Sequence, residues 1–199
     1  MKDTNYMDLF DQRMEHGPFS AAEQIAVLRG LGLDVSEEAA DDCVPETAYW
    51  PVLEAWGSGT FDFDNKVWTP SSDQVYAFDA EVFDIEGMYL HYFKGLQSIS
   101  REELTFTDVT QDNSQVNWEE PSGTVAVRFC LNGTRFQYDA QFAGDWLDIH
   151  IRKAVNRCLE QLGIEKRFYA TDGGQGEIIF FCTEDWARRF ETATLCFMS

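Results

Sequence analysis

The stretch TVAVRFCLNGTRFQYDAQF, residues 124–142, decides more of the fold than any other part of the chain. Asn132-Gly133 supplies the two positive φ angles of a type I′ turn, so the flanking residues are predicted to pair as a β-hairpin. Counting outward from the turn predicts three cross-strand pairs on one face: Phe129–Phe136, Val127–Tyr138 and Val125–Ala140. The other face is partly polar. One apolar face and one partly polar, solvent-exposed face indicate a sheet that packs against a core on one side only.

Two amphipathic helices are predicted on either side of this hairpin. After Asp84, taken as an N-cap, apolar residues recur at helical spacing as far as Leu96. After Asp145, also taken as an N-cap, a second apolar stripe runs to Leu162. Each stripe is wide enough to cover one face of a sheet. A last helix is predicted after Thr183, and further strands are predicted at 74–82, 104–109, 167–171 and 177–182.

The first part of the chain has helical patterns only. Ser20 and Glu23 form a capping box before an apolar-periodic run. Ser36 is predicted to cap a second, acidic helix through residues 37–38, and a third segment runs from Pro45 to Gly57. The sequence therefore predicts a helical N-terminal segment, 1–58, and an α+β domain, 59–199, which together form one compact body.

An internal similarity suggests a duplication. Residues 78–82 (FDAEV) resemble residues 138–142 (YDAQF), and each stretch leads through an Asp-capped helix to a strand that ends in Thr-Asp. A repeated strand–helix–strand unit would produce this pattern, although five loosely matching residues also arise by chance. Two such units could form one mainly antiparallel sheet with the amphipathic helices packed on one face.

The charge limits the partners. The chain has 35 acidic and 15 basic residues, which gives a formal net charge of −20. Such a surface repels nucleic-acid phosphates and anionic lipid, so neither nucleic acid nor a membrane is an expected partner. A basic protein partner would be attracted and steered inward. The alternative is that the charge serves only the solubility of an acidic cytoplasmic protein.

The cysteines indicate a reducing compartment. There are five, an odd number, and no two have the C-x-x-C spacing of a zinc or redox site. Their neighbours are mostly apolar, so they are predicted to be reduced, buried thiols of a cytoplasmic protein. The N-terminus lacks the pattern of a signal peptide, and no apolar run approaches the ~20 residues needed to span a bilayer.

No motif indicates a metal, a cofactor or a catalytic centre. Read as a calcium loop, the acidic stretch 62–65 fails at two required positions, and a half-buried edge strand is the better interpretation. The glycine-rich loop 172–176 precedes a strand instead of a helix, which indicates a hairpin turn and not a phosphate cradle. We therefore predict no metal, cofactor or catalytic residue, although residues distant in sequence can still converge in space.

Two groups of residues are candidate binding sites. Trp68 and Trp118, the latter followed by Glu119 and Glu120, are predicted either to anchor a basic protein surface or to fold back over the core. The other group is a basic stripe on the helix after Asp145, made of Arg152, Lys153 and Arg157. It is either a solvated face or a dock for an acidic partner, such as a second copy in a homo-oligomer.

The leading interpretation is a non-enzymatic module that binds a basic protein partner. In composition and class alone the chain resembles antitoxin or immunity proteins. The alternative is an enzyme or small-molecule-binding protein with a pocket lined by aromatic rings and carboxylates. That alternative requires a cleft where acidic side chains or histidine converge, whereas the leading interpretation requires a broad acidic face with an exposed tryptophan.

Overall fold

The computed structural model describes residues 5–36 and 43–199, and the predicted α+β class is confirmed. The described helices are α1 (Tyr6–His16), α2 (Ala21–Gly30), α4 (Trp50–Gly57), α5 (Met88–Ile99), α6 (Ile151–Gln161) and α7 (Glu184–Thr194). The described strands are β1 (Thr60–Asp62), β2 (Val67–Thr69), β3 (Tyr76–Asp79), β4 (Phe106–Asn117), β5 (Ser122–Leu131), β6 (Thr134–Gln141), β7 (Arg167–Gly173) and β8 (Gly176–Cys182). None of these helices is long and apolar enough to cross a bilayer.

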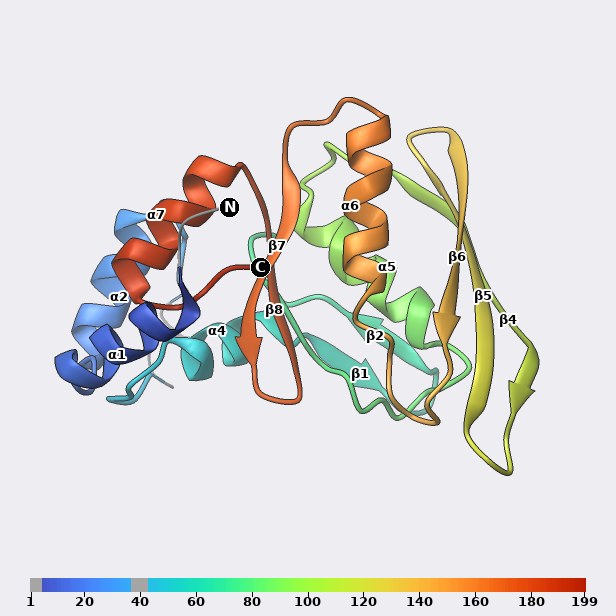
Figure 1. Ribbon diagram of the computed structural model, residues 1–199, viewed down its shortest axis with the longest axis horizontal. Helices are drawn as coiled ribbons and strands as arrows, with labels where there is room; N and C mark the ends of the chain where they lie inside the picture. The colour runs from blue at the N-terminus through green and yellow to red at the C-terminus, as the bar shows by residue number, and fades with distance from the viewer. Residues whose placement is uncertain (1–4, 37–42) are drawn as a thin grey trace.

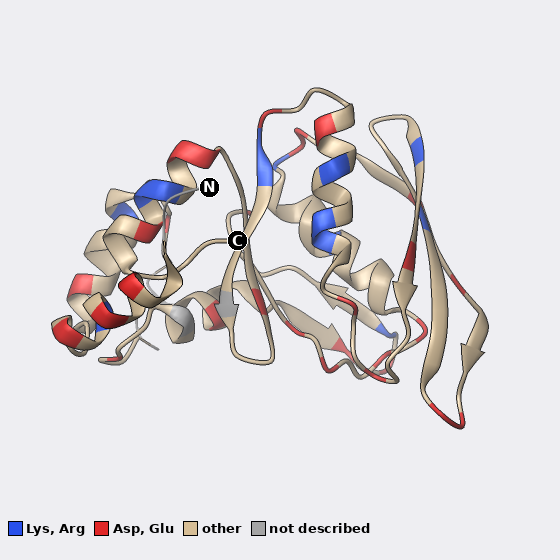
Figure 2. Cartoon of the chain, in the orientation of Figure 1, with Lys and Arg blue, Asp and Glu red and all other residues tan. Residues whose placement is uncertain are grey.

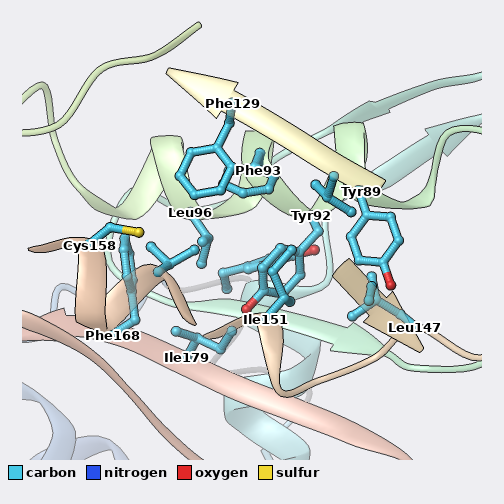
Figure 3. Close-up of a cluster of buried hydrophobic side chains, with 14 of the residues drawn as sticks. Tyr89, Tyr92, Phe93, Leu96, Phe129, Leu147, Ile151, Cys158, Phe168 and Ile179 are labelled. Atoms are coloured by element: carbon cyan, nitrogen blue, oxygen red, sulfur yellow. The ribbon is translucent and has the colours of Figure 1, made fainter. Parts of the chain in front are cut away.

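The described strands form three antiparallel sheets, where the sequence suggested one: β1–β2, β3–β8–β7 and β4–β5–β6. Helices α5 and α6 lie between the two three-stranded sheets and share one core with both (Figure 1). Figure 3 shows this core, in which Tyr92 and Leu96 of α5 meet Ile151 of α6 and Phe168 of β7. The apolar stripes of both helices are therefore buried, as their spacing predicts.

A second core lies on the other face of sheet β3–β8–β7. Helices α2, α4 and α7 cover that face (Figure 1). Along β8, Ile179 faces the first core, whereas Ile178 and Phe180 face the second. This central strand is thus buried on both sides, which explains its apolar run from Ile178 to Cys182. Helix α7 joins the N-terminal helices, because the Trp186 Nε1–H donates to the Leu31 carbonyl at 2.9 Å.

The hairpin register is confirmed. Strands β5 and β6 pair Phe129 with Phe136, Val127 with Tyr138 and Val125 with Ala140. Asn132 and Gly133 have φ angles of 49° and 82°. The capping box of α2 is also present, since Ser20 and Glu23 exchange hydrogen bonds with each other's backbone. The five cysteines are free and buried, as predicted.

Both predicted aspartate N-caps are wrong. Helix α5 begins at Met88 after Gly87, and the Asp84 side chain instead contacts His91. Helix α6 begins at Ile151, because residues 145–147 pair with residues 80–82 through the bonds Val82 N–H to Asp145 O and Leu147 N–H to Ala80 O, both 2.8 Å. Residues 145–147, predicted as the first turn of α6, are therefore extended chain. Their backbone bonds to residues 80–82 connect the two strand–helix–strand segments.

Other predictions differ in their boundaries. Asp62 ends strand β1, but residues 63–65 belong to the turn to β2 and not to an edge strand, and the Asp62 carboxylate accepts hydrogen bonds there from the backbone N–H groups of Asp64 and Asn65. Strand β4 continues to Asn117, well beyond the predicted end at 109, since pairing with β5 needs only its backbone. The predicted hairpin at 172–176 is confirmed, with a turn confined to Gly174 and Gln175 because Gly173 already pairs with Gly176. The acidic helix predicted after Ser36 falls on 37–42, outside the described residues.

Candidate functional site

A cavity of about 290 Å³ opens between the β1–β2 hairpin, strand β3, the segment that follows β3 and helix α5. Residues from segments far apart in the sequence meet there. Its lining includes Glu54, Ser58, Phe61, Trp68, Tyr76, Phe78, Asp79, Glu81, Phe83, Asp84, Met88, His91 and Tyr92. The volume is at the lower end of the range typical of small-molecule sites in proteins, so a ligand would have to be compact.

Aromatic rings form one wall of this cavity. The Trp68 ring lies edge-on to Tyr76 with centroids 5.2 Å apart, Tyr76 stacks on Phe78 at 5.4 Å, and Phe78 meets Tyr92 at 5.3 Å. Strand β3 presents Tyr76 and Phe78 on one face because alternate residues of a strand share a side. Trp68 is fixed further by its Nε1–H, which donates to the Ser58 carbonyl at 2.9 Å. The wall is therefore positioned before any ligand binds.

Carboxylates surround the aromatic wall. Glu54, Asp79, Glu81 and Asp84 line the cavity, and the lining includes no lysine or arginine among the described residues. Burial, and next the negative charge of Asp79, raise the pKa of Glu54. Figure 2 shows acidic residues at the end of β1 and along the segment after β3, whereas basic residues lie on α6 and at the start of β7. A positive charge in the cavity would relieve the repulsion that these carboxylates exert on one another.

Asp84 and His91 form a pair at the edge of the cavity. His91 Nε2 lies 3.2 Å from Asp84 Oδ2, and both side chains are mostly buried. Lys66, from the β1–β2 turn, reaches Asp84 Oδ1 at 3.8 Å, but its side chain is 65% exposed. If Nε2–H donates to Asp84, the hydrogen-bond pattern assigns the lone pair to His91 Nδ1, which then can accept a hydrogen bond.

Two polar atoms of lining residues lack a partner. His91 Nδ1 and the Tyr92 hydroxyl are buried with no hydrogen-bond partner among the described residues. Burial, followed by the nearby charge of Glu177, raises the pKa of Tyr92 well above its ordinary value, so this hydroxyl stays protonated. Buried polar groups are nearly always satisfied, but both of these atoms are covered by protein atoms and are not exposed to the cavity, so they are not contacts available to a ligand.

No family model, curated protein or solved structure matches the chain. The geometry of the cavity is thus the basis on which a function can be inferred. Among the described residues, no group of three or more His, Cys, Asp and Glu side chains is arranged to hold a metal ion.

The predicted tryptophan sites lie in two different places. Trp68 belongs to the cavity wall, whereas Trp118 lies in the β4–β5 turn, 53% exposed, with its ring edge-on to Phe142 at 5.0 Å. Glu119 and Glu120 are exposed in the same turn, where their N–H groups donate to the Asn117 side chain. The Trp118 ring therefore contacts the core on one side and is exposed to solvent on the other. Its binding to a basic partner stays a prediction.

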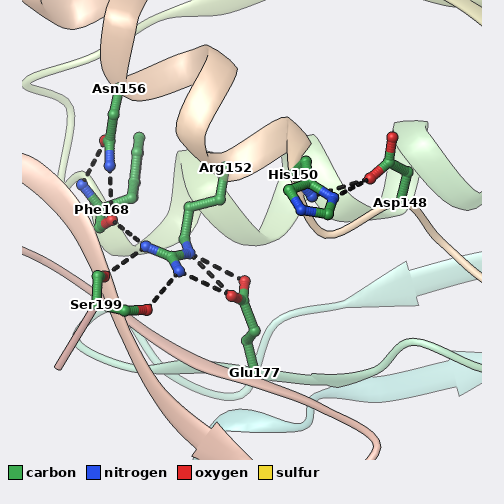
Figure 4. Close-up of polar contacts among 7 residues, drawn as sticks. All are labelled: Asp148, His150, Arg152, Asn156, Phe168, Glu177 and Ser199. Atoms are coloured by element: carbon green, nitrogen blue, oxygen red, sulfur yellow. Dashed lines mark hydrogen bonds and ion pairs between the residues drawn. The ribbon is translucent and has the colours of Figure 1, made fainter. Parts of the chain in front are cut away.

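The predicted basic stripe must be corrected at Arg152. This side chain is buried, with 3% exposed, and its guanidinium donates to Glu177 on β8 rather than to solvent (Figure 4). Asp148, four residues before Arg152, does not pair with it, because the Asp148 carboxylate accepts from the Tyr138 hydroxyl at 2.8 Å. Lys153 and Arg157 are exposed on α6. Docking of an acidic partner on these two, and a homo-oligomer, stay predictions.

Sequence reasoning missed most of the cavity residues. Glu54, Asp79 and Glu81 have no distinctive spacing, so nothing in the sequence singles them out. Asp84 and His91 are seven residues apart, but Asp84 precedes α5, so helical spacing does not bring the two together and the sequence did not indicate the pair.

Proposed function

We propose that the protein binds a small organic cation in the cavity between β3 and α5. The observation that carries the proposal is a pre-positioned aromatic wall inside a rim of four carboxylates. Aromatic faces attract cations through the ring quadrupole, and the attraction reaches about 2 kcal/mol where the cation is desolvated. Carboxylates add a longer-range attraction in the same direction. This proposal takes up the small-molecule alternative raised by the sequence.

Binding accounts for these groups better than catalysis does. The Asp84–His91 pair has the form of an oriented base, but a nucleophile hydrogen-bonded to the histidine is missing among the described residues, since His91 Nδ1 has no partner there. Covalent catalysis needs the nucleophile and its base within hydrogen-bond reach. His91 Nδ1 and the Tyr92 hydroxyl are covered by protein atoms, so the proposal rests on the aromatic wall and the carboxylates alone.

The proposal is tested by comparing choline with its uncharged carbon isostere, 3,3-dimethylbutan-1-ol. The two have the same shape, so their difference in affinity isolates the charge. We expect calorimetric titration to show choline binding about 30-fold more tightly, the equivalent of ~2 kcal/mol. Asp79→Asn should weaken choline binding and leave the isostere unchanged. Glu120→Gln, which removes an exposed carboxylate of the β4–β5 turn, is the matched control. Equal affinities for the two probes, or no choline binding, would refute the proposal.

Binding of a cation should also release protons in mildly acidic solution. The free protein holds Glu54 with a raised pKa, and a bound cation stabilises its carboxylate and lowers that pKa again. The complex therefore carries fewer protons than the free protein just above the ordinary carboxyl pKa of about 4.3, and affinity rises with pH through this window. Calorimetric titration with choline measures this release. At each of two pH values, about 5 and 8, the titration is run in two buffers that differ in ionisation enthalpy, and the difference in heat gives the number of protons released. Proton release at the lower pH should shrink in Glu54→Gln, and proton uptake there would contradict the assignment.

A further inference from the structure

A second cavity, of about 310 Å³, lies where the two cores meet. It is bordered by the turn after α2, the turn after α5 and the junction of β8 with α7. Ile99 and Phe181 on its wall belong to the core around α5, whereas Leu33 and Phe180 belong to the core under α7. Junctions between packed units are a common location of ligand sites in proteins.

The charge of this cavity is opposite to that of the molecule. Arg101, Lys166 and Arg189 line it, with Glu103 as the one acidic lining residue in the described part of the chain. The chain as a whole has more than twice as many acidic as basic residues. A concentration of three cations in one hollow of such a protein favours an anion there, because oppositely charged clefts focus the local potential.

The three cations are paired in ways that a ligand can replace. Arg101 contacts Asp73 at 3.1 Å, Arg189 contacts Asp185 at 3.4 Å, and Lys166 contacts Glu103. Asp73 and Asp185 do not line the cavity, and their side chains are 68% and 86% exposed. Exposed ion pairs contribute little to stability, so exchanging these carboxylates for a ligand oxyanion costs little. A guanidinium also matches the planar oxygens of a carboxylate or the oxygens of a phosphate.

The remaining wall is apolar and partly aromatic. Trp186 and Phe181 lie beside the cations, and the Lys166 ammonium sits 5.5 Å from the centre of the Phe181 ring. Trp186 is held in place by its hydrogen bond to the Leu31 carbonyl. We propose that this cavity binds a small organic anion, with its oxyanion on Arg101, Lys166 and Arg189 and its apolar body against Trp186. This site is separate from the cation cavity and does not depend on it.

The probes are benzoate, phenyl phosphate and the neutral benzyl alcohol, titrated into the ¹⁵N-labelled full chain. We expect saturable shifts of the amide signals of residues 99–103 and 181–189 with at least one of the two anions, and none with the alcohol. Which anion binds more tightly distinguishes a carboxylate ligand from a phosphate ligand. The double variant Arg101→Gln/Arg189→Gln should weaken binding at least about tenfold, the loss expected for charge-assisted hydrogen bonds.

Two controls make the outcome specific to the cavity. Arg128→Gln removes a half-exposed cation from strand β5, outside the cavity, and should leave the affinity unchanged. Asp79→Asn alters the cation cavity and should also leave it unchanged. Because all the substituted side chains are at least partly exposed, spectra of the free variants should match elsewhere. Non-saturable shifts, equal shifts with benzyl alcohol, or unchanged affinity in the double variant would overturn the proposal.

Discussion

Replacing Arg152 with methionine is expected to lower the free energy of unfolding by about 3–5 kcal/mol. The guanidinium is buried and donates to both Glu177 carboxylate oxygens at 2.9–3.1 Å (Figure 4). It also donates to the Phe168 carbonyl at 3.2 Å and to the Ser199 carbonyl at 2.6 Å. Without it, the carboxylate of Glu177 is left buried and unpaired on the central strand of a sheet. An uncompensated buried charge is among the most destabilising changes that a single substitution makes.

A double-mutant cycle tests this explanation. Arg152→Met/Glu177→Met removes both charges, and an apolar pair of similar volume is often as stable as the ion pair it replaces. We therefore expect the double variant to recover most of the stability that Arg152→Met loses, in urea unfolding at neutral pH. Arg157→Met is the matched control, since Arg157 is exposed on the same helix and its loss should cost less than about 0.5 kcal/mol. A loss at Arg152 no larger than at Arg157 would show that the network does not stabilise the fold.

Arg152 also shows where sequence reasoning stops. Its position on α6 was predictable from the apolar stripe, but its burial was not, because the counter-charge comes from Glu177, 25 residues away on β8. A basic residue beside a helical apolar stripe is normally solvated, and only a long-range partner makes burial tolerable. Long-range pairing of this kind leaves no local pattern.

Local rules succeeded where local physics decides the structure. The Asn132-Gly133 turn fixed the register of β5 and β6, and the Ser20–Glu23 box fixed the start of α2. In each case a few neighbouring residues satisfy their own backbone groups, so tertiary contacts have little to override. The aspartate caps failed for the opposite reason. Asp84 and Asp145 lie in segments whose backbone bonds or side chains have partners elsewhere in the fold.

The candidate site was predictable in kind but not in place. An aromatic and carboxylate-lined pocket was raised only as the alternative interpretation, and Trp68 was singled out as an anchor for a basic protein surface or a cover over the core. The cavity itself arises because β3 is the edge strand beside β8, and the β1–β2 hairpin lies over its exposed flank. The order of the strands depends on the whole fold. No residue spacing within β1, β2 or β3 indicates which strands will be neighbours.

Replacing Gly176 with alanine is expected to destabilise the protein by about 3 kcal/mol or more and to abolish choline binding, because the contact it disrupts is between backbones. Gly176 begins β8 and pairs with Asp79 of β3. A Cβ atom there would lie 1.7 Å from the Phe78 carbonyl oxygen and 3.0 Å from the Asp79 Cα. No side-chain rotation relieves such a contact, so β3 must move away from β8.

That movement links stability to the cavity, since Tyr76, Phe78 and Asp79 all lie on β3 and form its wall and part of its rim. Gly30→Ala is the matched control: a Cβ atom at the end of α2 meets nothing within 4 Å, and alanine favours the helix by up to about 1 kcal/mol. Urea unfolding and choline titration of both variants measure the two effects. If Gly176→Ala unfolds at the wild-type urea concentration and still binds choline, then β3 is not held against β8 as closely as the structure requires, and the aromatic wall cannot owe its geometry to that pairing.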